Sequence, residues 1–205
     1  MSYLTKILSR REWRVVLTDY LGLIGALALL ILVFSVSTDY FFSAANFQMI
    51  ANQIPAAVLV ATGMTYVLIV AGIDLSVGSV LGFCGAVMGA CLLRWHWPLW
   101  ATLPAVLLAG LACGGFNGWV ATRWRLPSFI VTLGMMEIGR GGAHLLTQSQ
   151  TLYIGAPIAW ITETSVLGLS LPFLVAVGVV VAGQLVLYRT VFGRYLVAIG
   201  TNEEA

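Results

Sequence analysis

The sequence predicts an all-α, polytopic membrane protein with about six transmembrane helices and a cytoplasmic N-terminus. Of its 205 residues, 60% are hydrophobic and only 9% are charged, whereas a water-soluble domain carries roughly 25% charged residues. Several apolar runs approach the roughly 20 residues that a helix needs to cross a bilayer. These runs are continuous rather than alternating, which indicates helices and not the strands of a barrel.

Six apolar spans are expected along the chain, and the first follows a basic cytoplasmic segment, residues 1–18. That start resembles the charged region of a signal peptide. However, the apolar run behind it is too long and lacks a small-residue cleavage site, so we expect a retained helix. The expected spans cover about residues 21–36, 54–71, 77–93, 99–121, 128–146 and 171–188.

The basic residues predict the orientation of these spans. A cytoplasmic N-terminus places eight of the ten Lys and Arg residues on the inner side, as the positive-inside rule requires. The eight are Lys6, Arg10, Arg11, Arg14, Arg123, Arg125, Arg189 and Arg194. Arg94 and Arg140 remain at the outer side or within the membrane. Trp95, Trp97 and Trp100 then form an aromatic belt at the outer surface.

Glycines recur at every fourth position of the fourth span, at Gly110, Gly114 and Gly118. Such a stripe allows the backbones of two transmembrane helices to approach closely. It can equally line a route for a solute. The sequence is compatible with both interpretations.

Asp74 is the only charged residue between positions 40 and 93, and Gly72, Ser76 and Gly78 surround it. As one helix, residues 40–93 would extend roughly 80 Å at 1.5 Å per residue, so the chain must turn back here. One interpretation is a turn at the cytoplasmic edge, in which Asp74 or Ser76 caps the next helix. The other is a broken helix that lines a cavity inside the membrane.

A second group of ionisable residues, Glu137, Arg140 and His144, lies on the fifth span. An acid inside a membrane needs a partner. Arg140 can pair either with Glu137, three residues away on the same helix, or with Asp74, and the sequence leaves both pairings open. Glu137 and His144 share nearly one helix face, where they either tune the choice of solute or are a local peculiarity.

Three blocks of the sequence resemble the permease subunits of bacterial ribose/xylose-type sugar ABC importers. They are "GMTYVLIVAGIDLSVGSVLG" at 63–82, "NGWVATRWRLPSFIVTLGMM" at 117–136 and "RTVFGRYLVAIGTNEEA" at 189–205, and they occur in the family's order. The resemblance implies that residues 1–205 are the N-terminal portion of a single, longer transmembrane permease domain. Residues 189–205 would be the start of its cytoplasmic coupling loop, so we expect a fragment or a truncated product.

The resemblance also implies function and partners. The subunit would translocate a small polar solute, a monosaccharide, across the bacterial inner membrane. Its partners would be an ABC ATPase subunit, a periplasmic or lipid-anchored sugar-binding protein and a second permease copy, identical or paralogous, in the lipid bilayer. No nucleic acid, metal or cofactor is expected in this chain. ATP and magnesium belong to the ATPase, since the chain has no G-x-x-x-x-G-K-[ST] phosphate loop.

Two sets of candidate functional residues follow. For the translocation pathway or helix break we expect Gly72, Asp74, Ser76, Gly78, Asn117, Glu137 and Arg140. For coupling to the ATPase we expect Gly193, Arg194, Gly200, Asn202, Glu203 and Glu204. In the coupling segment, Thr201 or Asn202 can cap a helix that carries both glutamates in its first turn; the alternative is a frayed end of the sixth span.

Other function classes remain to be weighed against a permease. A secondary transporter or channel would use Asp74 and Glu137 as sites for ions or protons. A membrane-embedded enzyme is not expected, because the chain has two histidines in total and no H-E-x-x-H motif. No catalytic residue is therefore assigned.

Overall fold

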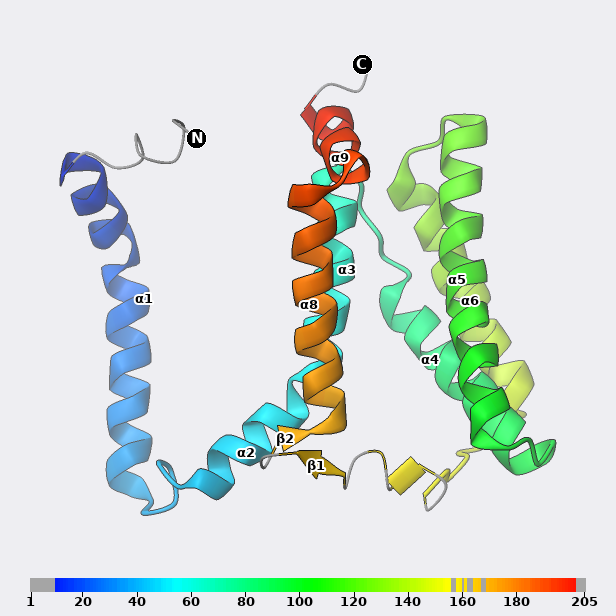
Figure 1. Ribbon diagram of the computed structural model, residues 1–205, viewed down its shortest axis with the longest axis horizontal. Coiled ribbons are helices and arrows are strands. Elements are labelled where there is room, and N and C mark those ends of the chain that lie inside the picture. The colour runs from blue at the N-terminus through cyan, green and yellow to red at the C-terminus, as the bar shows by residue number, and fades with distance from the viewer. Residues whose placement is uncertain (1–9, 156–157, 160, 162–163, 167–168, 202–205) are drawn as a thin grey trace. The chain divides into compact units, whose positions relative to one another are not determined.

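The computed structural model describes residues 10–155, 158–159, 161, 164–166 and 169–201, most of which are helical (Figure 1). The chain divides into two compact units, Met1–Ile50 and Ala51–Ala205. Whether they act together as one permease domain stays a prediction.

The first unit is dominated by helix α1 (Arg10–Ser37). Its window Tyr20–Ser37 is strongly apolar, and none of it is buried against other parts of the protein. An aromatic group follows the helix, with the ring of Phe41 stacked on that of Phe34 at 6.1 Å and in edge contact with that of Phe42 at 5.0 Å. This surface suits a helix whose solvent is lipid.

Helix α2 (Ala44–Gln53) crosses the boundary between the units and is followed by the helices of the second unit. These are α3 (Pro55–Ile69), α4 (Val77–Gly89), the π-helical turn η1 (Ala90–Arg94), α5 (Leu99–Trp124), α6 (Ser128–Thr147), α8 (Leu171–Arg189) and α9 (Val191–Thr201). Two short antiparallel strands, β1 (Ser165–Val166) and β2 (Leu169–Ser170), precede α8. Prolines stand at or just before the starts of α3, α5, α6 and α8, where they cost no helical hydrogen bond.

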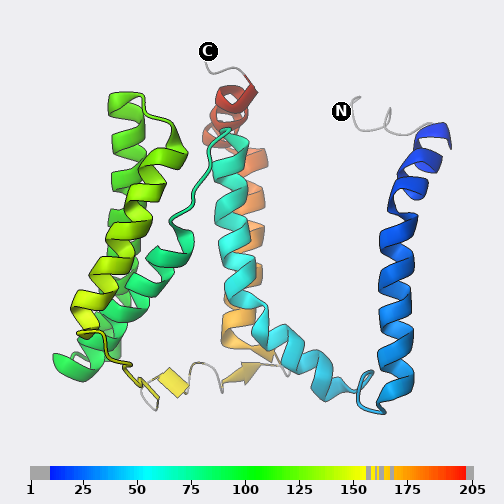
Figure 2. The ribbon, with the colours of Figure 1, turned by 180° about the vertical axis from the view of Figure 1, so that it is seen from behind.

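Within the second unit the helices form two groups. Helix α4 packs against α6 and α5, and α3 packs along α8 (Figures 1 and 2). The phenol of Tyr66 on α3 donates a 2.6 Å hydrogen bond to the carbonyl of Gly183 on α8. Leu152, in the segment after α6, lies against Gly89 at the end of α4. Among the residues whose burial is described, seven apolar residues are buried, and most belong to α4, η1, α5 and α6, so this group holds the core: Ala86, Ala90, Cys91, Val120, Val131, Met135 and Ala176.

The all-α fold with several membrane spans is confirmed, but the structure does not establish the predicted number of six. Among the described residues, four helices are long and apolar enough to cross a membrane: α1, α4 with η1, α5 and α8. Helices α2 and α3 together would make a fifth, broken span. Helix α6 occupies almost the predicted residues, yet it is not one of these spans. It carries Glu137, Arg140, His144 and several glycines, which lower its hydropathy.

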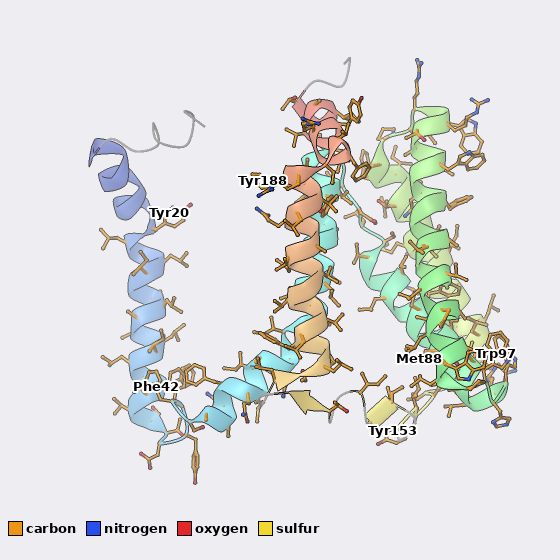
Figure 3. The ribbon with its side chains drawn as sticks, viewed as in Figure 1. Tyr20, Phe42, Met88, Trp97, Tyr153 and Tyr188 are labelled. Atoms are coloured by element: carbon orange, nitrogen blue, oxygen red, sulfur yellow. The ribbon has the colours of Figure 1, made fainter. Side chains whose placement is uncertain are left out.

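The ends of the second unit agree with the predicted topology. Helix α9 and the turn between α5 and α6 lie at one end (Figure 1). Tyr188 lies toward that end, whereas Trp97 and Tyr153 lie toward the other (Figure 3). Arg123, Arg125, Arg189 and Arg194 belong to the elements of the first end, which is the end predicted to be cytoplasmic. The side on which the N-terminus lies stays a prediction.

Candidate functional site

The helical path is broken between α3 and α4, where the sequence analysis placed a turn. Residues 72–76 are not helical, and two of their backbone amides bond to side chains of α6. The amide of Ile73 donates to Ser128 Oγ at 2.9 Å, and the amide of Leu75 donates to Thr132 Oγ1 at 3.1 Å. The Thr132 hydroxyl lies 3.3 Å from the carbonyl of Ile73. Non-helical backbone is tolerated at membrane depth only when its polar groups are satisfied in this way.

Asp74, Ser76 and Asn117 form a hydrogen-bonded relay at the break. Asp74 Oδ1 accepts bonds from the amide and from the hydroxyl of Ser76, at 2.8 and 2.6 Å. Because this hydroxyl donates to Asp74, it accepts from Asn117, whose Nδ2 lies 3.2 Å away. Asn117 is 7% exposed, and its Oδ1 is buried without a hydrogen-bond partner among the described residues. The relay therefore fixes an acceptor that lacks a donor.

The predicted helix cap takes a different form. Ser76 is the N-cap residue of α4, but its side chain makes no capping bond. Asp74 binds Ser76 itself and does not reach the free amides of the first helical turn. The short side chain of Asp74 closes a turn with the residue two positions ahead, so α4 starts without the expected cap.

The relay lies inside the ends of α5 and α6. Thr132 is four residues into α6 and Asn117 is seven residues from the end of α5. At 1.5 Å per residue, the break lies about 6–10 Å from the end of this helix group. Its position relative to the membrane, at the edge or within the span, stays a prediction.

Two cavities flank Asp74. One has a volume of about 380 Å³ and lies between the break, α5 and α6. The other, of about 200 Å³, lies between α4 and α5. Asp74, Gly114 and Asn117 line both cavities, and Gly118 lines the larger one. The larger volume falls within the range of roughly 300–1,000 Å³ typical of small-molecule sites.

The glycines at the break lie in different surroundings. A Cβ added at Gly72 would lie 3.1 Å from Val67, so the chain approaches α3 closely there. At Gly78 an added Cβ would meet nothing within 4 Å. Gly72 lines the larger cavity, whereas neither cavity includes Gly78 in its lining.

The structure separates the two charged groups. Arg140 Nη1 lies 3.4 Å from Glu137 Oε1, and both side chains are more than half exposed. Asp74 instead bonds to Ser76. Of the pairings left open by the sequence, Glu137 with Arg140 is the one that forms.

Ser128 and Thr132 were not identified from the sequence. They stand four residues apart at the start of α6, so they share one helix face. A pair of hydroxyl residues at this spacing is the signal that could have revealed them. Their role became visible only when the structure placed that face against the break.

The described part of the predicted coupling segment forms α9, which packs on α8 and α3 at the end of the second unit that is predicted to be cytoplasmic. Thr190 Oγ1 accepts a 3.2 Å bond from the amide of Gly193, which closes the first turn of α9. Gly193 lies against Leu187, and Gly200 lies against Ile69. Both approaches leave no room for a side chain, and Arg194 borders a nearby surface cavity of about 410 Å³.

The predicted cap at Thr201 or Asn202 stays a prediction, because the helix that it would start lies outside the described residues. Thr201 is the last described residue of α9, and its hydroxyl bonds back to the carbonyls of Val197 and Ala198. Polar residues within a helix often satisfy their hydroxyls in this way. Asn202, Glu203 and Glu204 lie outside the described residues.

Within the described part of the chain, no group of three or more His, Cys, Asp or Glu residues could hold a metal ion. Cys84, Cys91 and Cys113 are free thiols. The thiol of Cys84 lies 3.7 Å from the carbonyl of Val106, a contact between α4 and α5. The site is thus a set of hydrogen-bonding groups around cavities.

Comparison with known proteins gives a consistent result. Residues 46–205 match the family described as the branched-chain amino acid transport system permease component. The ribose import permease of Haemophilus influenzae is 35% identical over 185 residues, which cover 88% of this chain and 57% of that protein. The fructose import permease of Bifidobacterium longum is 37% identical over 152 residues, covering 72% of this chain and 42% of that protein. No solved structure matches the chain.

The xylose transport system permease of Escherichia coli is also similar, with 38% identity over 131 residues that cover 63% of this chain and 33% of that protein. The chain spans about half the length of the curated relatives it matches. The family description refers to amino acids, whereas these relatives are named for sugars. The resemblance to sugar permeases, expected from three sequence blocks, is therefore confirmed. The chain belongs to the transport-system permease component family and is a multi-pass inner-membrane protein.

Proposed function

We propose that the chain is the membrane-spanning part of an ATP-driven importer that moves a small polar solute, a monosaccharide, across the bacterial inner membrane. The names of the relatives support this solute class, since they refer to ribose, fructose and xylose. One structural observation carries the proposal: the polar residues Asp74 and Asn117 line two cavities inside the helix group.

The relay at the break suits a polyhydroxylated solute. A sugar presents many hydroxyl donors, and the Asp74 carboxylate beside both cavities is an acceptor. The remaining cavity wall is mostly apolar or glycine, so few groups hold the solute strongly. Weak binding at several sites along a pathway allows a solute to leave as well as to bind. The proposed pathway residues are Gly72, Asp74, Ser76, Gly78 and Asn117 at the break, together with Glu137 and Arg140 on the exposed face of α6.

The proposed partners supply energy and selection. An ABC ATPase subunit would bind ATP and magnesium, and a periplasmic or lipid-anchored sugar-binding protein would deliver the solute. A second permease copy would complete the pathway. This chain would form and break no covalent bond. Coupling would act through α9, because Gly193 and Gly200 allow this helix to lie close against α8 and α3. The proposed contact with the ATPase also includes Arg194, Asn202, Glu203 and Glu204.

Uptake of labelled ribose, fructose and xylose into proteoliposomes tests this function. The chain is joined to the C-terminal part of a relative and reconstituted with the ATPase and the binding protein. We expect uptake that requires ATP and both partners. Uptake that follows a proton gradient without the ATPase would instead support a secondary transporter that uses Asp74 and Glu137, and would refute the importer.

A further inference from the structure

Helix α6 has two opposite faces of different character. Thr132, Met135 and Gly139 are buried, and Gly139 lies against Ser79 of α4. At 100° per residue, Glu137 and Arg140 lie on the opposite side of the helix, and His144 follows them two turns beyond Glu137. The Glu137 and Arg140 side chains are 62% and 58% exposed. The helix therefore turns an ion pair away from its own helix group.

This ion pair lies in the middle of α6. Glu137 is nine residues and Arg140 twelve residues from the start of the helix at Ser128. These separations correspond to about 14 and 18 Å along the helix axis. The sequence predicts that α6 spans the membrane, and ionisable side chains in the middle of a span face protein or water, because lipid cannot solvate them. On that prediction, something other than lipid covers this face.

We propose that a second copy of this chain docks on the face of α6 that carries Glu137 and Arg140. This inference deepens the proposed function, because it assigns a surface to the second copy. The patch is electrically neutral and carries both signs, so it is complementary to itself. A two-fold axis along the membrane normal brings the same face of two copies together at equal depth.

The spacing of the pair suits this symmetry. Three residues along a helix correspond to a rise of about 4.5 Å, which the long arginine side chain can span. Each Arg140 then lies between the Glu137 of its own helix and the Glu137 of the second copy. Four charges alternate in sign around the axis, and each carboxylate gains a second cationic neighbour in a site that lipid no longer reaches.

Small residues on the same side allow the two helices to approach. Gly134 and Gly141 stand seven residues apart beside the ion pair, and a Cβ added at either would meet nothing within 4 Å. Close backbone approach at small residues is the usual source of helix packing in lipid. Helix α1 of the same chain is a poorer occupant, because its window Tyr20–Ser37 offers no charged side chain to the pair.

Complementation between charge variants tests the interface. Two differently tagged copies of the chain are co-expressed and purified through one tag. Glu137→Arg leaves two positive side chains on the face, and Arg140→Glu leaves two negative ones. We expect each variant to lose co-purification with itself several-fold, and the mixture of both variants to recover it toward the wild-type level. Recovery also shows that the two variants fold.

A mixture that co-purifies no better than either variant alone would overturn the proposal, as would variants that self-associate like the wild type. Cross-linking supplies a second measurement, in a chain whose Cys84, Cys91 and Cys113 are replaced by alanine. We expect oxidation to link Gly141→Cys between copies but not Gly142→Cys, which lies against Phe83 of α4. Equal linking of both, or of neither, would contradict the assigned face.

Failure here is distinguishable from failure of the proposed function, because sugar uptake is measured separately. ATP-driven uptake with charge-independent pairing would retain the importer and reject this interface. Charge-dependent pairing without uptake would retain the interface and reject the importer.

Discussion

Helices α5 and α6 both carry glycines at close spacing, and two glycines of each helix lie in opposite surroundings. On α6, Gly139 and Gly142 lie against Ser79 and Phe83 of α4, so close that an added Cβ would be crowded. On α5, an added Cβ at Gly114 or Gly118 would meet nothing within 4 Å, and both glycines line the larger cavity. Gly139 and Gly142 thus pack α6 against α4, whereas Gly114 and Gly118 leave space beside α5.

The difference shows why a small-residue stripe alone does not identify a solute route. Glycine permits close packing only if a neighbour fills the space. Along α5 the neighbour is the broken segment 72–76. The amides of Ile73 and Leu75 in this segment bond to α6, whereas its contact with α5 is the bond from Asn117 to Ser76. Our central claim is that this break keeps a water-filled cavity open against α5.

Substitution of one glycine on each helix gives the largest expected contrast. Gly139→Leu forces side-chain atoms into the backbone of α4, which lies 3.2 Å from an added Cβ, and we expect a loss of about 1–3 kcal/mol or more from overpacking. Gly114→Leu is the matched control, because its side chain meets open space. Thermal unfolding of detergent-purified protein measures both. Equal melting temperatures would remove the distinction between the two helices.

Removal of the Thr132 hydroxyl should cause the second-largest loss of stability. Thr132→Val keeps the shape of the side chain but leaves the amide of Leu75 unpaired, which costs about 1–3 kcal/mol. Thr65→Val is the control, since the Thr65 hydroxyl bonds only within its own helix, to the carbonyl of Ala61. The same unfolding measurement applies. If both variants melt alike, the contact between α6 and the break is unimportant for stability.

Neutralising Asp74 should have a smaller effect. Asp74→Asn exchanges two charge-assisted hydrogen bonds from Ser76 for weaker neutral ones, a difference of about 1 kcal/mol. Asp39→Asn alters an exposed carboxylate outside the helices and should change neither stability nor assembly. Melting temperature and recovery of folded protein from membranes are compared for the two. Indistinguishable variants would deny the relay any special role.

Gly110→Ala should have the smallest effect on stability. It adds a position of intermediate crowding to the comparison between Gly139 and Gly114. An added Cβ would lie 3.4 Å from the Cys84 sulfur, an ordinary contact. The gain in helix propensity offsets the loss of space, so we expect a change below about 1 kcal/mol. A melting temperature lowered as far as that of Gly139→Leu would show that α5 is packed as tightly as α6 at this position.

Hydropathy was sufficient to predict where most helices lie, because an apolar run has to match the bilayer. The expected span 128–146 corresponds to α6 at Ser128–Thr147, and the expected turn to the break before Val77. The sequence did not predict the rotation of each helix about its axis, which decides which face meets the neighbouring helices. That rotation decides that Ser128 and Thr132 meet the break, and that Arg140 pairs with Glu137 and not with Asp74.

The C-terminal region shows a second limit. The expected sixth span, 171–188, agrees with α8, which ends at Arg189, but no glycine or proline predicts how closely α9, which begins at Val191, follows it. The hydroxyl of Thr190 bonds both to Val186 of α8 and to the amide of Gly193. A threonine is a weaker boundary signal than glycine or proline, and the close approach of Gly200 to Ile69 depends on tertiary structure.

Labelling of cysteines by a membrane-impermeant maleimide tests the cavity most directly. Gly114→Cys and Gly115→Cys are compared in a chain without native cysteines; the two positions lie at the same depth of α5, but only Gly114 lines a cavity. We predict rapid labelling at position 114 and slow labelling at position 115. Equal rates, or labelling confined to position 115, would contradict a water-filled cavity between the break and α5.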